Sequence, residues 1–223
     1  MPLFPPKLFA SNPIDIIEGV RLYRDYLGPA AQRALLVELR RLIREAPFYQ
    51  ARMPRSGKPL SVRMTNFGPL GWFADEKSYR YTDRHPETGK PWPAIPESLL
   101  GLWCDLTGYE APPECCLVNF YEPGARMGLH RDSDEQALDA PVLSISLGDQ
   151  AVFRIGGAAR RDKTRSLKLT SGDIVTMGGP ARLCFHGIDR ILPGTSTLLA
   201  EDFPPAGRLN LTLRRVTPSA TPQ

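Results

Sequence analysis

Two of the three histidines in this sequence stand in contexts that favour metal binding. His130 lies in the run LHRD, and Asp132 follows it two positions later. Since residues i and i+2 of an extended chain point to the same face, both side chains can reach one metal ion. His186, in CFHG on a later predicted strand, completes two imidazoles and one carboxylate, the set that leaves open positions on non-haem Fe(II). H-x-D is a short pattern, so core or surface roles for both histidines stand as the alternative.

The third histidine and the cysteines carry weaker signals. His85 lies in the charged run DRHPE, which predicts a solvated loop residue. The cysteines lack C-x-x-C spacing, and two of them are adjacent in sequence, which suits a disulfide between them poorly. We therefore expect buried free thiols at Cys104, Cys115, Cys116 and Cys184.

The last predicted strand, residues 208–214, alternates polar and apolar side chains. One face carries Arg208, Asn210, Thr212 and Arg214. Two arginines with amide and hydroxyl groups between them suit a dicarboxylate bound through bidentate pairs, although a solvated face would give the same pattern. Asn119 and Tyr121 share a face of the strand that precedes the H-x-D motif. Two strands are thus predicted to converge on one ligand.

Positive charge is concentrated in residues 47–96. This segment holds eight Lys/Arg and four Asp/Glu, a net charge of +4 that equals the charge of the whole chain. Aromatic residues are interleaved with these charges: Trp72, Tyr79, Tyr81 and Trp92. Basic and aromatic side chains together can hold phosphates and stack on bases, so the segment favours nucleic-acid contact over a merely solvated loop.

The elements around these residues are two helices and a series of short strands. Apolar periodicity predicts a helix over 31–46, ended by Pro47, and a second from Pro96 to Gly108. Between them, residues 47–96 show no sustained periodicity and are typical of a lid or binding loop. Eight strands are predicted at 115–121, 127–132, 141–148, 151–155, 166–170, 173–177, 182–187 and 208–215, with a long loop over 192–207. Eight short strands favour a mainly β fold with flanking helices, built on a double-stranded β-helix (jelly roll, cupin-like) that encloses a pocket.

Length and composition agree with this fold. The 223 residues fit one domain, and 23 prolines with 19 glycines favour a β-rich chain. There is no run of 18 apolar residues and no continuous apolar stretch near the N-terminus, so a soluble, cytoplasmic protein without a membrane partner is expected. We expect the tail, 217–223, to be disordered.

Read together, the motifs resemble the AlkB family of Fe(II)/2-oxoglutarate-dependent dioxygenases. The runs that carry the resemblance are CLVNFYEPGARMGLHRDSDE, SISLGDQAVFRIGG, SGDIVTMGG, CFHGI and RLNLTLR, preceded by NFGPLGWFADEKSYRY and KPWPAIP. The resemblance implies a single domain with an N-terminal helical extension (1–46), a nucleotide-recognition lid (47–96), a helix plus catalytic core (97–216) and the tail. It also implies oxidative demethylation of 1-methyladenine and 3-methylcytosine in DNA, single-stranded DNA being preferred, with RNA as a further substrate, by a monomer that uses Fe(II), 2-oxoglutarate and O2 and releases formaldehyde.

The resemblance also implies roles for particular residues. Iron is expected on His130, Asp132 and His186. 2-Oxoglutarate is expected on Asn119, Tyr121, Arg208, Asn210 and Arg214, with Arg214 on the distal carboxylate. The damaged base is expected against Trp72, Tyr79 and Tyr81, with Asp134 at its exocyclic amino group and Arg160 near the substrate strand. Two alternatives stay open: the same chemistry on tRNA, a protein side chain or a lipid, and a non-catalytic jelly roll with a structural metal.

Overall fold

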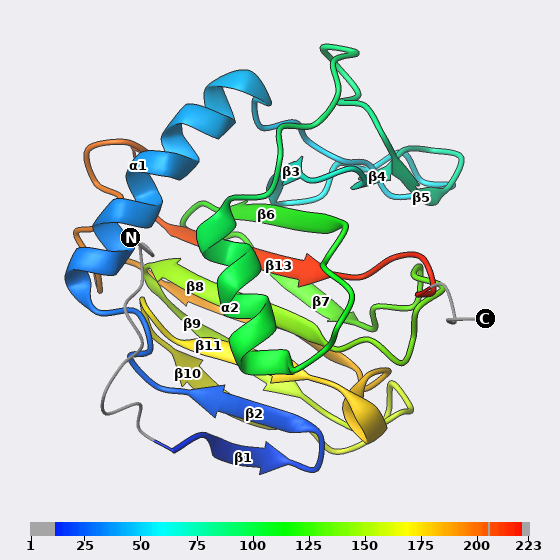
Figure 1. Ribbon diagram of the computed structural model, residues 1–223, viewed down its shortest axis with the longest axis vertical. Coiled ribbons are helices and arrows are strands. Elements are labelled where there is room, and N and C mark those ends of the chain that lie inside the picture. The colour runs from blue at the N-terminus through cyan, green and yellow to red at the C-terminus, as the bar shows by residue number, and fades with distance from the viewer. Residues whose placement is uncertain (1–11, 205, 220–223) are drawn as a thin grey trace.

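Both predicted helices are present in the computed structural model, which describes residues 12–204 and 206–219 (Figure 1). Helix α1 spans Pro29–Glu45, with a proline in its first turn, and ends before Pro47, where a proline would remove a helical hydrogen bond. Helix α2 spans Glu97–Thr107. Gly108 closes α2 in the left-handed conformation, with φ of 63°, which glycine adopts at little cost.

The strands form a large sheet, a smaller sheet and a hairpin, and all pairs are antiparallel. The large sheet has the order β1-β2-β11-β8-β13-β6-β3. Its strands are β1 (Ile14–Ile17), β2 (Val20–Tyr23), β3 (Arg63–Phe67), β6 (Cys115–Tyr121), β8 (Val142–Gly148), β11 (Ile174–Met177) and β13 (Arg208–Arg214). The smaller sheet has the order β10-β9-β12-β7. Its strands are β7 (Met127–His130), β9 (Gln150–Ile155), β10 (Arg165–Leu169) and β12 (His186–Leu192).

These two sheets confirm the predicted jelly roll, because β6 to β13 are the eight strands expected from the sequence. One strand is shifted: the sequence predicted 182–187, whereas β12 starts at His186 and runs to Leu192. The residues before it instead form the 3-10 turn η1 (Gly179–Ala181) and a loop. β12 has a bulge near Asp189 and continues to Leu192. The loop predicted over 192–207 therefore begins at the end of this strand.

The two faces of β13 separate the packing core from the pocket. Leu209, Leu211 and Leu213 are fully buried in the layer formed with α1 and α2, which cover the outer face of the large sheet in Figure 1. Because side chains alternate along a strand, Arg208 and Arg214 project to the opposite face, toward the smaller sheet. The predicted polar face is therefore the inner face of the jelly roll, and it is not a solvated surface.

The sequence pattern missed five strands. β1 and β2 extend the large sheet beyond β11, so residues 1–46 contribute strands as well as a helix. Within the lid segment, β3 pairs with β6, and β4 (Gly71–Ala74) pairs with β5 (Tyr79–Thr82) as a hairpin. Each of these strands has only four or five residues, too few for periodicity to be recognised.

Two smaller expectations also need correction. Cys104 is exposed, whereas Cys115, Cys116 and Cys184 are buried as predicted, and all four are free. In the predicted disordered tail, Thr217 is held by hydrogen bonds to the Glu114 carboxylate, and residues 220–223 lie outside the described residues. Within the described ranges, neither helix is long and apolar enough to cross a membrane.

Candidate active site

Two adjacent strands and the loop after one of them bring the predicted metal ligands together. His130 is the last residue of β7 and His186 the first of β12, and the two face each other directly in the strand register. Their ring centroids are 4.5 Å apart. Asp132 lies two residues beyond the end of β7, which is shorter than the strand predicted over 127–132. One ligand atom from each of the three residues nevertheless lies within 4.8 Å of the other two.

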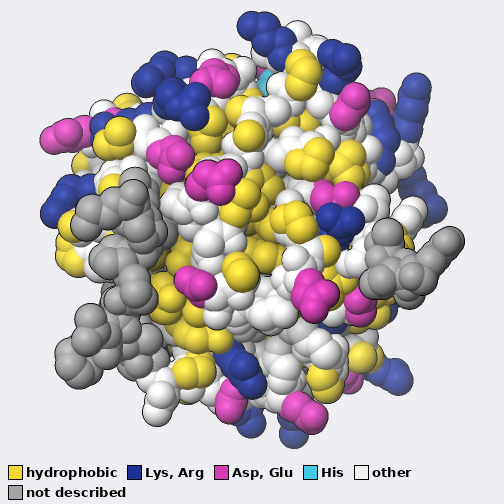
Figure 2. Space-filling model, in the orientation of Figure 1, with side chains coloured by type: hydrophobic (Ala, Val, Ile, Leu, Met, Phe, Trp, Pro, Cys, Tyr) yellow, Lys and Arg dark blue, Asp and Glu magenta, His cyan; other side chains and the backbone are white. Residues whose placement is uncertain are grey.

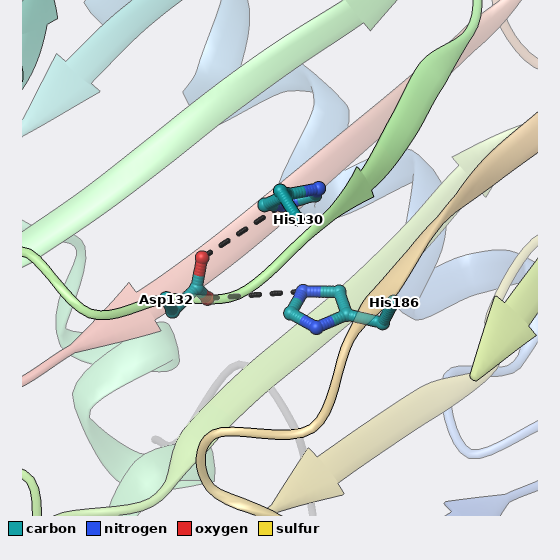
Figure 3. Close-up of side chains that lie close together, drawn as sticks. All are labelled: His130, Asp132 and His186. Atoms are coloured by element: carbon teal, nitrogen blue, oxygen red, sulfur yellow. Dashed lines mark ion pairs between the residues drawn. The ribbon is translucent and has the colours of Figure 1, made fainter. Parts of the chain in front are cut away.

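Each histidine ring is oriented by a backbone carbonyl. Nδ1 of His130 lies 3.0 Å from the oxygen of Gly128, and Nδ1 of His186 lies 3.0 Å from the oxygen of Cys184. A carbonyl only accepts, so Nδ1 must carry the proton, which leaves the lone pair on Nε2. The two Nε2 atoms lie 3.8 and 3.9 Å from the oxygens of Asp132 (Figure 3).

The charge states also suit a cation. Burial alone would raise the pKa of Asp132, but the charges of Arg214, both histidines and Arg182 outweigh it and hold the pKa well below its usual value. Burial, together with the neighbouring His130, lowers the pKa of His186 to about 4. Oδ2 of Asp132 is buried and has no hydrogen-bond partner among the described residues. An ionised carboxylate oxygen left unpaired beside two imidazole lone pairs fits a divalent metal.

A cavity of about 400 Å³ lies beside these ligands, between the two sheets. Arg208 lines the cavity and is fully buried. Its Nη2 donates to the hydroxyl of Ser146 over 2.7 Å, but Nε and Nη1 have no partner among the described residues. Burial lowers the pKa of Arg208 to about 10, so the group is still cationic at neutral pH. A buried cation that forms no ion pair with a described residue points to an anionic ligand in the cavity.

The other predicted cofactor residues line the same cavity. Asn119, Tyr121 and Asn210 all face it. Oδ1 of Asn119 is also buried without a described partner, whereas Asn210 donates to Ser144 and to the carbonyl of Ile145. The cavity therefore offers both charge and hydrogen bonds to a ligand that is not part of the protein.

Arg214 lines the same cavity, and its guanidinium group contacts carboxylates of the protein. The resemblance implies a role on the distal carboxylate of 2-oxoglutarate; in the structure its Nη2 lies 2.9 Å from Oδ1 of Asp132 and its Nη1 lies 3.4 Å from Oε1 of Glu135. Its charge is already balanced by carboxylates of the protein, which keep its pKa well above the usual value despite its burial. Alternation along β13 showed that both arginines share a face, but could not show which one meets protein carboxylates. Of the two arginines on this face, Arg208 is the one with no carboxylate partner in an ion pair among the described residues, whereas on Arg214 only Nε is left without a hydrogen bond.

Two of the three aromatic residues expected at the base lie on the cavity wall. Trp72 and Tyr79 line the cavity and stack on each other, with ring centroids 5.5 Å apart and an interplanar angle of 22°. Nε1 of Trp72 donates to Oδ2 of Asp134 over 2.8 Å. Tyr81 does not line the cavity, contrary to the prediction, because its hydroxyl is turned inward and donates to Glu135.

The rim of the cavity carries two arginines. Arg160 was predicted near the substrate, and Arg131 was missed, although it stands between the two ligands of the H-x-D motif. Both guanidinium groups lie over the ring of Phe185, at 5.0 Å for Arg160 and 5.7 Å for Arg131. The signal that could have identified Arg131 is an exposed arginine next to a metal-binding motif.

His85 is also not what its neighbours suggested. It is only 1% exposed, and its Nε2 donates to the carbonyl of Pro47 over 2.7 Å while Nδ1 accepts from the backbone of Glu87 and Thr88. Its ring packs against Trp92 and Tyr49. His85 therefore connects the start of the lid segment to its later part, and the prediction of a solvated loop residue was wrong.

A jelly roll with two histidines and an aspartate beside a cavity that holds an unpaired arginine is the arrangement of Fe(II)- and 2-oxoglutarate-dependent oxygenases. Residues 19–214 match the family model of the 2OG-Fe(II) oxygenase superfamily. The chain is 55% identical over 205 residues to the alpha-ketoglutarate-dependent dioxygenase AlkB homolog of Caulobacter vibrioides, covering 92% of this chain and 91% of that protein. It is 39% identical over 201 residues to the alpha-ketoglutarate-dependent dioxygenase AlkB of Escherichia coli, covering 88% of this chain and 90% of that protein.

Structural comparison agrees. The solved structure of OsALKBH1 matches with a TM-score of 0.76 at 33% identity, covering 91% of this chain and 99% of that one. The chain belongs to the AlkB family of Fe(II)/2-oxoglutarate-dependent dioxygenases. Other relatives include a DNA N(6)-methyladenine demethylase of Arabidopsis thaliana and a tRNA demethylase of Schizosaccharomyces pombe, of which this chain covers 48% and 58%.

Proposed function

We propose that this protein removes methyl groups oxidatively from N-alkylated bases, 1-methyladenine and 3-methylcytosine, in DNA. The observation that supports the proposal is that three features line one cavity: the candidate metal ligands, Arg208 with its unpaired nitrogens, and the Trp72–Tyr79 stack. Oxidative chemistry, cofactor binding and base recognition then occur in one enclosed space. The lid segment, 47–96, supplies the base contacts, and the core, 97–216, supplies the chemistry.

In this proposal His130, Asp132 and His186 hold Fe(II), and Arg208 pairs with the distal carboxylate of 2-oxoglutarate. Asn119, Tyr121 and Asn210 add hydrogen bonds to the same co-substrate. Arg214 acts through Asp132. It holds Oδ1 of that carboxylate in place, so Oδ2 is directed toward the cation. Together with O2, the bound iron and 2-oxoglutarate supply hydroxylation of the N-methyl group, with succinate, CO2 and finally formaldehyde as products.

The protein's own side chains recognise the damaged base. 1-Methyladenine and 3-methylcytosine carry positive charge, which the π face of Trp72 attracts. Trp72 and Tyr79 are already in contact, so the base meets the ring face of Trp72 that Tyr79 leaves free. Oδ2 of Asp134 accepts from Trp72, and its Oδ1, which accepts no hydrogen bond from a described residue, is available to the exocyclic amino group. A methylated base has lost its normal pairing, so less free energy is needed to extrude it.

Single-stranded DNA is the preferred partner in this proposal, bound by a cytoplasmic monomer, and RNA is a further substrate. Because one relative is named as a DNA demethylase and another as a tRNA demethylase, the first test is whether DNA or RNA is the substrate. Turnover should be compared on methylated single-stranded DNA, methylated tRNA and a peptide library, with products weighed by mass spectrometry. Faster loss of methyl groups from tRNA or a peptide than from DNA would replace the proposed substrate with the alternative.

Trp72→Ala should separate base recognition from cofactor chemistry. Trp72 lies on the lid hairpin, whereas the candidate iron and 2-oxoglutarate residues lie on the jelly roll. We expect 2-oxoglutarate turnover without DNA to persist, while demethylation falls because the variant lacks a stacking interaction worth about 1–3 kcal/mol. Paired assays of succinate and formaldehyde measure the two activities. Normal demethylation by this variant would remove Trp72 from the base pocket.

Basic residues of the lid should determine part of the salt dependence of DNA binding. In Figure 2, Lys and Arg side chains stand at the upper and right-hand edges of the face, where Figure 1 places the lid, and also at the left and lower edges. Replacing Arg52, Arg55 and Lys58 with glutamine should flatten the slope of log affinity against log salt by about 0.7 for each phosphate of a single strand that the variant no longer neutralises. Arg80→Gln is the matched control, because Arg80 is already paired with Asp75 at 2.7 Å. An equal change in slope in both proteins would show that these three residues do not bind phosphates.

A further inference from the structure

A chain of buried polar contacts connects the lid to the candidate metal site. The hydroxyl of Tyr81 donates to Oε1 of Glu135, and Nη1 of Arg214 lies 3.3 Å from that hydroxyl. The same Nη1 lies 3.4 Å from Oε1 of Glu135, and Nη2 of Arg214 lies 2.9 Å from Oδ1 of Asp132. The hydroxyl of a lid residue is thus two contacts away from the carboxylate that faces the metal position.

Arg182 closes this network from the other side. Its Nη2 lies 3.1 Å from Oε2 of Glu135, and its Nη1 donates to the backbone oxygen of Asp132 over 2.6 Å. Glu135 and Arg182 are almost completely buried. Two carboxylates and two guanidinium groups therefore form a neutral quartet, Asp132, Glu135, Arg182 and Arg214, that fixes Asp132 through both its backbone and its side chain. In such a network, moving one group changes the contacts of the others.

Among the described residues, Tyr81 is the one residue of the β4–β5 hairpin that forms hydrogen bonds with the quartet, one to Glu135 and one from Arg214. Across that hairpin Tyr81 is paired directly with Trp72, the aromatic residue on the cavity wall. Backbone pairing prevents the two positions from moving independently. A base that holds the hairpin in place through Trp72 therefore also holds Tyr81 against Glu135 and Arg214.

We infer that Tyr81 and Glu135 are positioning residues that couple engagement of nucleic acid by the lid to the orientation of Asp132. The inference rests on the proposed function, since it takes Asp132 as a metal ligand and Trp72 as a base contact. When the lid is engaged, the Tyr81 hydroxyl holds Glu135 and Arg214 in place, Oδ1 of Asp132 stays occupied, and Oδ2 stays directed at the cation. Metal and nucleic acid then each favour binding of the other, and linkage requires the two effects to be equal.

The coupling can be measured without catalysis. Mn(II) is the probe, titrated anaerobically at saturating 2-oxoglutarate with and without a single-stranded oligonucleotide carrying one 1-methyladenine. For the unaltered protein we expect the oligonucleotide to tighten Mn(II) binding by about tenfold, within the range usual for coupled sites. Tyr81→Phe should bring this ratio close to one, while both ligands still bind separately and the thermal melt still shows a folded protein.

Tyr49→Phe is the matched control. It also removes a buried hydroxyl near the lid, one that donates to the carbonyl of Trp72 over 2.6 Å, but Tyr49 makes no hydrogen bond to a member of the quartet among the described residues. Its coupling ratio should remain that of the unaltered protein. A Tyr81→Phe ratio equal to the unaltered one, or an equal decrease in Tyr49→Phe, would overturn the inference.

The same titrations separate this inference from the proposed function. If the unaltered protein binds both Mn(II) and the oligonucleotide but with a ratio of one, the coupling is wrong and the proposed function stands. If it binds no Mn(II) at these ligands, or binds the methylated oligonucleotide no better than an unmethylated one, the proposed function itself fails and the inference fails with it.

Discussion

Replacing His130 with alanine is expected to abolish demethylation while leaving the protein folded. The side chain is 39% exposed and packs at the edge of the cavity, so its removal opens no void in a close-packed core. Mutation of residues that merely support a metal ligand costs about 10–100-fold in metal affinity or activity, so removal of a ligand should cost more. Metal content after dialysis, formaldehyde release and the thermal melt together check this result.

Arg131→Ala is the control for His130→Ala, because Arg131 is the next residue along the chain but its side chain is directed to the rim over Phe185. It should retain the metal and the ability to decarboxylate 2-oxoglutarate. Full metal occupancy and normal formaldehyde release in His130→Ala would contradict the ligand assignment.

The corresponding change at Asp132 is expected to affect the stability of the fold as well as metal binding. Asp132→Ala would remove the ligand and also the carboxylate that faces buried Arg214. Leaving one partner of a buried ion pair alone typically costs about 3–5 kcal/mol of stability. Removal of a ligand without an effect on the fold is therefore expected for His130 and not for Asp132.

Arg208→Lys should raise the concentration of 2-oxoglutarate needed for turnover much more than that of DNA. Lysine keeps the charge but lacks the planar fork that can pair with a carboxylate through two hydrogen bonds. Removing a charge-assisted hydrogen bond costs about 1.5–3 kcal/mol, which corresponds to about 10-fold to 150-fold in affinity. Steady-state titrations of each substrate at saturating concentrations of the other give both values.

Arg214→Lys provides the comparison, because it makes the same chemical change on the same strand face. Since both terminal nitrogens of Arg214 contact protein carboxylates, this variant should weaken metal binding more than 2-oxoglutarate binding. If Arg214→Lys, rather than Arg208→Lys, were the variant with the higher 2-oxoglutarate requirement, Arg214 would be the residue on the distal carboxylate and the role proposed for Arg208 would be wrong.

The site residues that sequence reasoning identified are those whose role depends on strand alternation. The H-x-D spacing, the late histidine and the polar face of residues 208–214 follow from local geometry, and all three converge in the structure. The eight core strands were recognisable because turn residues separate them. Short strands such as β1 and β4 were not, because pairing with other strands, rather than their own sequence, makes them extended.

Contacts between polar and charged residues that are far apart in the sequence could not be predicted from the sequence pattern. Nothing local shows that Arg182 meets Glu135, or that the hydroxyl of Tyr81 turns away from the cavity. The same limit explains the wrong prediction for His85, which looked solvated because its sequence neighbours are polar. It also explains why the carboxylate partners of Arg214, which lie on other elements, could not be predicted.

The central claim is that one cavity joins cofactor oxidation to removal of a methyl group from a base. Its most direct test is a single-turnover reaction of the iron-loaded protein with 2-oxoglutarate, O2 and a single-stranded oligonucleotide that carries one 1-methyladenine. We expect the oligonucleotide to lose the mass that separates methyladenine from adenine, with one formaldehyde and one succinate formed for each methyl group removed. Succinate formed while the oligonucleotide keeps its mass would contradict the claim.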